Sequence, residues 1–253
     1  MKERNEMIHS TENGNTRSTV DEYPIATLAW YMLGVLLIAN VLSFVDRQIL
    51  VLLVQPIRQD LGISDTQISL LQGFAFTILY SIVGLPLGRY ADSHNRRNLI
   101  ICGVAIWSVM TMLCGFAHTY GQLFAARVGV GIGEATLAPA AYSMICDAFR
   151  PHRRVTALGI YSSGIYLGIG ASVALGGVVL ALISNATEVS LPLIGAVRSW
   201  QAAFICVGAP GLLIALLMLT VREPRRHFNS KAGGESRTLA ETWRYLVRYR
   251  SLV

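Results

Sequence analysis

The sequence contains little charge and no targeting segment. Charged residues make up 14% of its 253 residues, whereas an ordinary soluble domain carries about 25%. Residues 1–24 are polar and lack the basic start and apolar stretch of a secretory signal peptide. Hydrophobic residues make up 53% of the chain, and the mean hydropathy is +0.49. This composition is typical of an integral membrane protein.

Cysteine is also scarce. The four cysteines lie in apolar runs without the spacing of a metal site or a disulfide framework, so we expect small buried hydrophobic side chains. The sequence also lacks a recognisable pairing of a nucleophile with a base. We therefore predict no metal, no cofactor and no enzymatic activity. The cysteines are Cys102, Cys114, Cys146 and Cys206.

Long uncharged stretches predict an all-α membrane protein with six transmembrane helices, since about 20 apolar residues cross a bilayer. Residues 25–221 form this domain. Residues 1–24 are expected to be a disordered cytoplasmic tail, and 222–253 a cytoplasmic linker with a basic amphipathic helix at 238–250. The predicted spans are 23–45 with a continuation to about 54, 66–88, 98–126, about 123–146, 155–187 and 202–221.

Lysine and arginine are distributed unevenly between the two predicted sides. The N-terminal tail, the second–third loop and the fourth–fifth loop hold three each, the C-terminal segment holds eight, and the opposite side holds two. This bias predicts that both termini are cytoplasmic. The distribution of the net charge of +6 therefore indicates contact with a membrane surface and argues against nucleic-acid binding. We expect a multi-pass protein of a bacterial inner membrane or plasma membrane, with the lipid bilayer as its surroundings.

The loop between the second and third spans is dense in arginine. It has the pattern Gly-x-x-x-Asp-x-x-x-Arg-Arg, formed by Gly88, Asp92, Arg96 and Arg97. Asn95, a residue that tolerates the left-handed conformation, fits a tight turn here. An ordinary basic loop is the alternative interpretation. Asp147, Arg153 and Arg154 end the fourth span on the same side and predict a salt-bridge cluster with Arg96 and Arg97.

The fourth span carries two ionisable residues, Arg127 and Glu134, and the glycines Gly129 and Gly133. No strand precedes this segment, which argues against a dinucleotide-binding loop. On a helix the glycines permit close packing. The two ionisable residues share one stripe about 10 Å apart. Glu134 lies deep enough to indicate a transport pathway, whereas Arg127 could instead anchor the helix at the membrane surface.

The first span carries Asp46 and Arg47 among apolar neighbours. A structural pair near the helix end is one interpretation. A carboxylate in a poorly hydrated cavity can also bind a proton near neutral pH, which suits a site of proton coupling. In the fifth span, small residues recur every four positions and predict a packing seam for a neighbouring helix. They are Gly164, Gly168, Ser172 and Gly176.

These segments together resemble the spinster-like branch of the major facilitator superfamily. The resemblance rests on Asn40-Val-Leu-Ser-Phe-Val-Asp46-Arg47, the 88–97 loop, residues 127–135, and Trp200 to Phe204 through Arg222-Glu-Pro224, within roughly residues 25–250. The loop signature is superfamily-wide. The Asp46-Arg47 pair of the first span together with the Arg127–Glu134 motif of the fourth is found in fewer families, although organic-anion symporters share part of this combination. Two positions depart from the loop signature, Ser93 where a basic residue is usual and Asn95 in place of glycine.

The resemblance implies a function. Spinster-like proteins move lysolipids and related amphiphiles, some with proton coupling. By position, Asp46, Arg47 and Glu134 would be the central polar and proton-linked residues, with Arg127 nearby. The Asp92 loop and its arginines, with Asp147 and Arg154, would form a cytoplasmic gate against a helix of the other half.

The chain corresponds to only one half of such a transporter, the N-terminal six helices with their 3+3 inverted repeat. A facilitator places its site between two halves, so the expected partners include a missing C-terminal half or a second six-helix bundle. We predict a truncated or split secondary transporter of organic, amphiphilic or anionic solutes, driven by protons. The alternative is a non-transporting half-size protein that regulates or assembles with another half.

Overall fold

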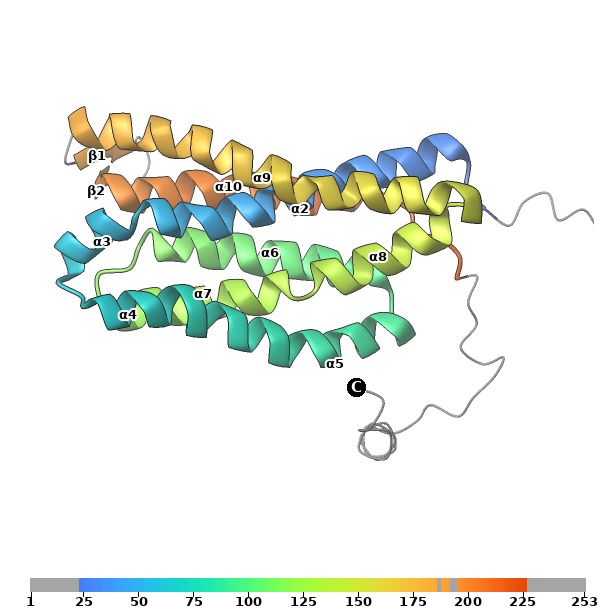
Figure 1. The fold of residues 1–253 in the computed structure, drawn as a ribbon, viewed down its shortest axis with the longest axis horizontal. Helices are drawn as coiled ribbons and strands as arrows, with labels where there is room; N and C mark the ends of the chain where they lie inside the picture. The colour runs from blue at the N-terminus through green and yellow to red at the C-terminus, as the bar shows by residue number, and fades with distance from the viewer. Residues whose placement is uncertain (1–22, 186–187, 192–194, 227–253) are drawn as a thin grey trace, which may run out of the picture.

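The structure is a computed structural model that describes residues 23–185, 188–191 and 195–226, which form an elongated helical bundle with one small hairpin (Figure 1). The tail at 1–22 and the predicted amphipathic helix at 238–250 lie outside the described residues. The elements are α2 (Ala26–Leu52), α3 (Val54–Leu61), α4 (Asp65–Ser69), the π-helix η1 (Leu70–Ile78), α5 (Leu79–Ser93), α6 (Arg96–Cys114), α7 (Tyr120–Glu134), α8 (Leu137–Ala148), α9 (Pro151–Asn185), β1 (Glu188–Leu191), β2 (Gly195–Arg198) and α10 (Ser199–Met218).

Helix α2 extends past the charged pair at 46 and 47, as the apolar pattern predicts, and ends at Leu52. The short helix α3 follows and ends at Gly62, whose φ of 60° is a left-handed conformation that glycine adopts without steric cost. Ser64 then begins α4 with a capping box, because its hydroxyl accepts the Gln67 N–H while the Gln67 side chain accepts the Ser64 N–H. These end signals define the turn that reverses the chain.

Helices α4, η1 and α5 form one continuous helical segment over Asp65–Ser93. The chain then turns at His94, and Asn95 begins α6 by accepting the Asn98 N–H at 2.9 Å. The expectation of a left-handed Asn95 is wrong, since its φ is −68°. The residue instead acts as a helix N-cap, for which asparagine is among the preferred residues.

The predicted fourth span is divided into two helices, α7 and α8, by Ala135 and Thr136. Pro139 favours the interruption, because proline has no N–H to donate to the carbonyl of Ala135 and is best accommodated in the first turn of a helix. The Thr136 hydroxyl donates to the Gly133 carbonyl at 2.8 Å and satisfies one of the carbonyls at the end of α7.

Helix α9 begins with proline, a residue favoured at the first helical position. It is followed by an antiparallel hairpin in which β1 pairs with β2, from Glu188 opposite Arg198 to Leu191 opposite Gly195. The sequence predicted a loop in this region and missed the hairpin. Among the described residues, five helices are long and apolar enough to cross a membrane: α2, the α4–α5 segment, α6, the Pro151–Gly177 part of α9, and α10. Helices α7 and α8 are individually shorter, with 15 and 12 residues.

Close helix packing holds the bundle together. Helix α2 packs against α9 and α10, while α6 packs against α7 and α10. A side-chain carbon at Gly168 would lie 2.6 Å from the Phe44 side chain, and one at Gly133 would lie 2.7 Å from the Trp107 backbone nitrogen. Both separations are too short for non-bonded atoms, so a larger residue at either position would force the helices apart.

The cysteines are distributed differently from the prediction. Cys114 is buried, but Cys146 is partly exposed and Cys102 and Cys206 are exposed. The prediction is wrong for those three because many apolar side chains of this bundle also face outward, such as Leu85, Leu213 and Leu216. An apolar run therefore does not by itself indicate burial in a bundle of this kind.

The arginine-rich turns gather at one end of the bundle. The start of α2, the α5–α6 turn, the α8–α9 turn and the end of α10 lie together at the right of Figure 1, whereas α3 and the hairpin lie at the opposite end. We call the first the basic end. Its arginines include Arg89, Arg96, Arg97, Arg150, Arg153 and Arg154.

Candidate functional site

Helices α2 and α7 bring the predicted pathway residues together in the interior. Arg47 and Ser43 lie one turn apart on α2, and both donate to the same oxygen of Glu134, the last residue of α7. The distances to Glu134 Oε2 are 2.6 Å from Arg47 Nε and 2.9 Å from Ser43 Oγ. The Glu134 side chain is fully buried, whereas 27% of the Arg47 side chain is exposed. Arg47 therefore lies between Glu134 and the accessible surface.

A second charged pair lies beside the first. Asp46 Oδ2 and Arg127 Nη1 are 3.6 Å apart, and both side chains are 3% exposed. Within the described part of the chain, both carboxylate oxygens of Asp46 and the Nε and Nη1 atoms of Arg127 lack hydrogen-bond partners, as does Glu134 Oε1. The separation exceeds that of a direct hydrogen bond. This pair is thus held by charge attraction in a buried setting, and Arg127 is not a surface anchor.

Three aromatic rings surround the guanidinium group of Arg47. Its central carbon lies 4.9 Å from the ring centre of Phe44, 4.6 Å from that of Phe76 and 5.0 Å from that of Tyr80. Phe76 and Tyr80 come from η1 and α5, and their rings stack at 5.5 Å. Cations are attracted to such ring faces. The sequence analysis missed this cage, since the π-helical winding that positions Phe76 has no clear sequence signal.

A cavity of about 150 Å³ opens at this site. Arg47 and Glu134 contribute charge to its lining, Asn40 and Ser43 contribute polar groups, and three tyrosines contribute rings with hydroxyl groups. The lining therefore combines an ion pair, hydrogen-bonding groups and aromatic surface, which can bind both polar and apolar parts of a small molecule. The tyrosines are Tyr80, Tyr142 and Tyr161.

The residues predicted to form the gate cluster lie separately, at the basic end. Arg96 is almost completely buried, and its guanidinium group donates to Asp147 Oδ2 at 2.5 Å, Ser143 Oγ at 2.8 Å, Glu223 Oε1 at 2.8 Å and the Pro224 carbonyl at 3.1 Å. The pairing of Arg96 with Asp147 agrees with the predicted cluster. Arg154 does not join it and donates instead to the Phe149 carbonyl at 3.2 Å.

The segment after α10 binds both sides of the α5–α6 turn. Glu223 accepts the backbone N–H groups of Arg96 and Arg97, at 3.2 and 2.7 Å, and so caps the start of α6. Arg226 donates to the carbonyls of Ala91, Asp92 and His94 around the end of α5. Sequence reasoning missed both roles. An acidic residue directly after a span, on the side rich in arginine, was the available signal.

The remaining predicted gate residues have fewer contacts. The Asp92 side chain is exposed at the surface of the bundle, and Gly88 approaches Pro139 of α8, with a hypothetical side-chain carbon 3.9 Å from it. Arg97 donates to the Val221 carbonyl at 3.2 Å. The structure therefore places Arg96, Arg97 and Asp147 in one network with Glu223, and Asp92 at its edge.

The predicted packing residues lie on two separate seams. Gly129 and Gly133 of α7 face Met110 and Trp107 of α6. Gly164, Gly168 and Gly176 of α9 face α2, next to Asn40, Phe44 and Leu52 respectively, and Ser172 is buried between them. The described residues contain no group of three or more histidine, cysteine or acidic side chains that could hold a metal ion.

Comparison with known proteins identifies the family of the chain. The Major Facilitator Superfamily pattern matches residues 36–253. The chain is 34% identical to an MFS-type efflux pump of Mycolicibacterium smegmatis, over 86% of this chain and 47% of that protein. It is 28% identical to a probable L-galactonate transporter of Escherichia coli, over 76% and 39%. The chain thus spans less than half the length of these relatives.

Solved structures give the same assignment. A bacterial homologue of the human lysosomal transporter Spinster, in an inward-facing and unoccupied conformation, superposes with a TM-score of 0.75 at 34% identity. The match covers 89% of this chain and 50% of that one. The family pattern, the sequence relatives and this structure therefore agree that the chain belongs to the Major Facilitator Superfamily and is related to its spinster branch.

Proposed function

We propose that the chain crosses the membrane six times, with the basic end in the cytoplasm. In this arrangement α7 and α8 together form the fourth crossing, and the five long helices form the others. The start of α2 and the end of α10 lie at the same end of the bundle, as an even number of crossings requires (Figure 1). The excess of arginine at this end supports its cytoplasmic placement.

We infer further that the chain provides the N-terminal half of a proton-coupled transporter of organic anions, including amphiphilic ones. The observation that carries this proposal is the Arg47–Glu134 pair, in which the cation is accessible from a cavity and the carboxylate is buried behind it. An anionic solute entering the cavity would meet Arg47 first. The aromatic cage beside Arg47 would contact an apolar part of the same solute.

The geometry suggests how solute and proton are linked. A solute anion that pairs with Arg47 competes with Glu134 for the same guanidinium group. A buried carboxylate that loses its cation is costly unless it takes up a proton. Glu134 would therefore be protonated as the solute binds and would release the proton as Arg47 returns. The adjacent Asp46–Arg127 pair would respond to this change in charge, because both pairs lie on the same two helices.

The cluster at the basic end would act as the cytoplasmic gate. Arg96 fixes α6 to α8 through Asp147 and to the segment after α10 through Glu223. This leaves Asp92 exposed at the α5–α6 turn, where it could contact a helix of a second half. In a facilitator the site lies between the two halves, so a second half would complete both the cavity and the gate.

Transport by reconstituted protein tests this function. The chain, alone and with a co-expressed C-terminal half of a related transporter, is placed in vesicles containing a pH-sensitive dye. Galactonate and a lysophospholipid then serve as probes. We expect proton movement that depends on the probe in the paired sample. Glu134→Gln should reduce that movement to the rate of protein-free vesicles, since glutamine cannot carry a proton.

Asp65→Asn is the matched control, because Asp65 is an exposed carboxylate whose ion pair with Arg58 lies at the surface. It should leave proton movement unchanged. Persistent coupling in Glu134→Gln would contradict the role of Glu134. Absence of flux in every sample would instead favour the alternative of a non-transporting half-size protein, and flux by the chain alone would exclude that alternative.

A further inference from the structure

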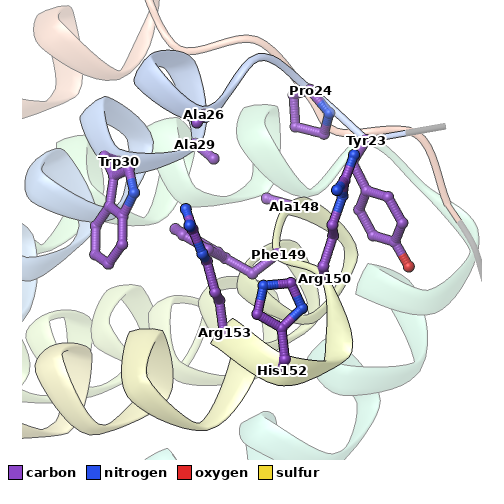
Figure 2. Close-up of a pocket in the computed structure, with 10 residues that line it drawn as sticks. All are labelled: Tyr23, Pro24, Ala26, Ala29, Trp30, Ala148, Phe149, Arg150, His152 and Arg153. Carbon is purple, nitrogen blue, oxygen red and sulfur yellow. The ribbon is translucent and has the colours of Figure 1, made fainter. Parts of the chain in front are cut away.

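A second cavity lies at the basic end, away from the Arg47–Glu134 site. It measures about 260 Å³ and lies between the start of α2 and the turn that joins α8 to α9 (Figure 2). Alanines form the part of the wall nearest α2 and α8, and their small side chains leave the space open. They are Ala26, Ala29 and Ala148.

Among the described residues, three basic side chains and no acidic one line this cavity. Arg150, His152 and Arg153 come from the α8–α9 turn and the first turn of α9. The Arg153 guanidinium group extends toward α2, and that of Arg150 extends toward Tyr23 in the segment before α2, with its central carbon 6.0 Å from the ring centre (Figure 2). Two arginines around one space repel each other unless an anion lies between them.

Two described carboxylates of this end, Asp147 and Glu223, are already engaged elsewhere, since both bind Arg96. None of the ion pairs found within residues 23–185, 188–191 and 195–226 includes Arg150, His152 or Arg153. The first turn of α9 also holds no acidic residue to offset the partial positive charge of the helix start. Within the described part of the chain, no carboxylate pairs with these three basic side chains, so the cavity presents positive charge to an occupant.

Exposed apolar side chains adjoin the cavity and distinguish a lipid from a free anion. Trp30, which lines the cavity, is 38% exposed, while Ile25, directly before α2, and Val155, two residues after Arg153 on α9, are 72% and 78% exposed. Tryptophan is enriched where a membrane meets water. A basic cavity with apolar surface beside it matches a molecule that has a charged head and hydrocarbon chains. Basic pockets between membrane helices on the cytoplasmic side bind such headgroups.

We propose that this cavity binds the phosphate headgroup of an anionic phospholipid of the cytoplasmic leaflet, held by Arg150 and Arg153. This site goes beyond the proposed transport function and depends only on the membrane orientation. It would anchor the start of α2 to the α8–α9 turn through the lipid. Phosphatidylglycerol serves as the probe because it carries one phosphodiester charge.

Lipid binding to the full chain in detergent, measured by native mass spectrometry, tests the site. We expect phosphatidylglycerol to bind more tightly than phosphatidylcholine with the same acyl chains. Arg150→Gln and Arg153→Gln should each weaken phosphatidylglycerol binding about fivefold, since each arginine near an anionic surface has an effect of that order. Arg89→Gln, an exposed arginine of the same end outside the cavity, should change binding less than about twofold.

Two further measurements distinguish lipid binding at this cavity from non-specific electrostatic attraction to the basic end. Ala26→Trp fills the cavity and keeps every charge, so it should weaken phosphatidylglycerol binding as the arginine variants do. Glycerol 1-phosphate, which has the headgroup without the chains, should bind far more weakly. Equal loss in Arg89→Gln, unchanged binding in Ala26→Trp, or equal affinity for glycerol 1-phosphate would each overturn the lipid site. Thermal melting of every variant checks that it is folded.

Discussion

The charged residues of the interior and those of the basic end form two networks that differ in how completely they are hydrogen-bonded. At the basic end, all three guanidinium nitrogens of Arg96 donate, to side chains or to a carbonyl. In the interior, both oxygens of Asp46 and one of Glu134 accept no hydrogen bond from any described residue. Both networks contain buried charges, but their hydrogen bonding is unequally complete.

This difference indicates different tasks. A buried charge network with every donor used is costly to rearrange, since any exchange leaves a charge without a partner. The interior network has carboxylate oxygens that accept no hydrogen bond, so a proton can join it, and a solute anion would replace Glu134 on Arg47. The basic end is thus suited to holding helices in place, and the interior to changing its partners.

Removing Arg96 is expected to have the largest effect on stability. Arg96→Gln removes the guanidinium group that pairs with Asp147 and Glu223. We expect it to lower the free energy of unfolding by about 3–5 kcal/mol. Arg97→Gln should cost less than about 1 kcal/mol, because Arg97 is partly exposed. Chemical unfolding in mixed micelles measures both. Similar losses in the two variants would show that the network adds nothing beyond surface charge.

Double-mutant cycles compare the two networks directly. The Arg96–Asp147 pair, at 2.5 Å, should show a coupling free energy of about 2–3 kcal/mol, whereas the Asp46–Arg127 pair, at 3.6 Å, should show about 1 kcal/mol or less. The variants are Arg96→Gln with Asp147→Asn, and Arg127→Gln with Asp46→Asn. Equal coupling in the two cycles would remove the distinction between them.

The aromatic cage of Arg47 gives the smallest expected effect. Tyr80→Leu removes one ring face from the guanidinium group and should cost about 0.5–1 kcal/mol of stability. Tyr166→Leu is the control, since Tyr166 is 77% exposed on α9. Thermal melting distinguishes the two variants, and a loss in the control as large as in Tyr80→Leu would count against the cage.

Much of the fold was predictable from uncharged stretches, because crossing a bilayer requires long apolar helices. The break in the fourth segment was not predicted, although Pro139 favours it. The hairpin between α9 and α10 was also missed, since its residues lie in a stretch whose composition does not separate strand from helix or loop. The sequence pattern therefore predicts which segments are apolar helices better than it predicts where those helices are interrupted.

The site was predictable where a charged residue is unusual and unpredictable where it depends on geometry. Asp46, Arg47, Arg127 and Glu134 stood out because ionisable residues are rare in membrane helices. The sequence could not tell which acid pairs with which base, since neighbours on α2 point in different directions. The role of Phe76 depends on a π-helical turn that has no clear sequence signal, and that of Glu223 depends on a contact across the bundle whose partner its position in the sequence does not identify.

Glu134 lies at the interruption between α7 and α8, where the two helices can change their relative tilt. Glu134 ends α7, and after two intervening residues α8 begins with a proline in its first turn. A helix resists bending through its backbone hydrogen bonds, and here Pro139 has removed one of them. A change in tilt between the two helices is therefore easiest beside the carboxylate that holds Arg47. Helical hydrogen bonding is thus interrupted directly beside a buried charge.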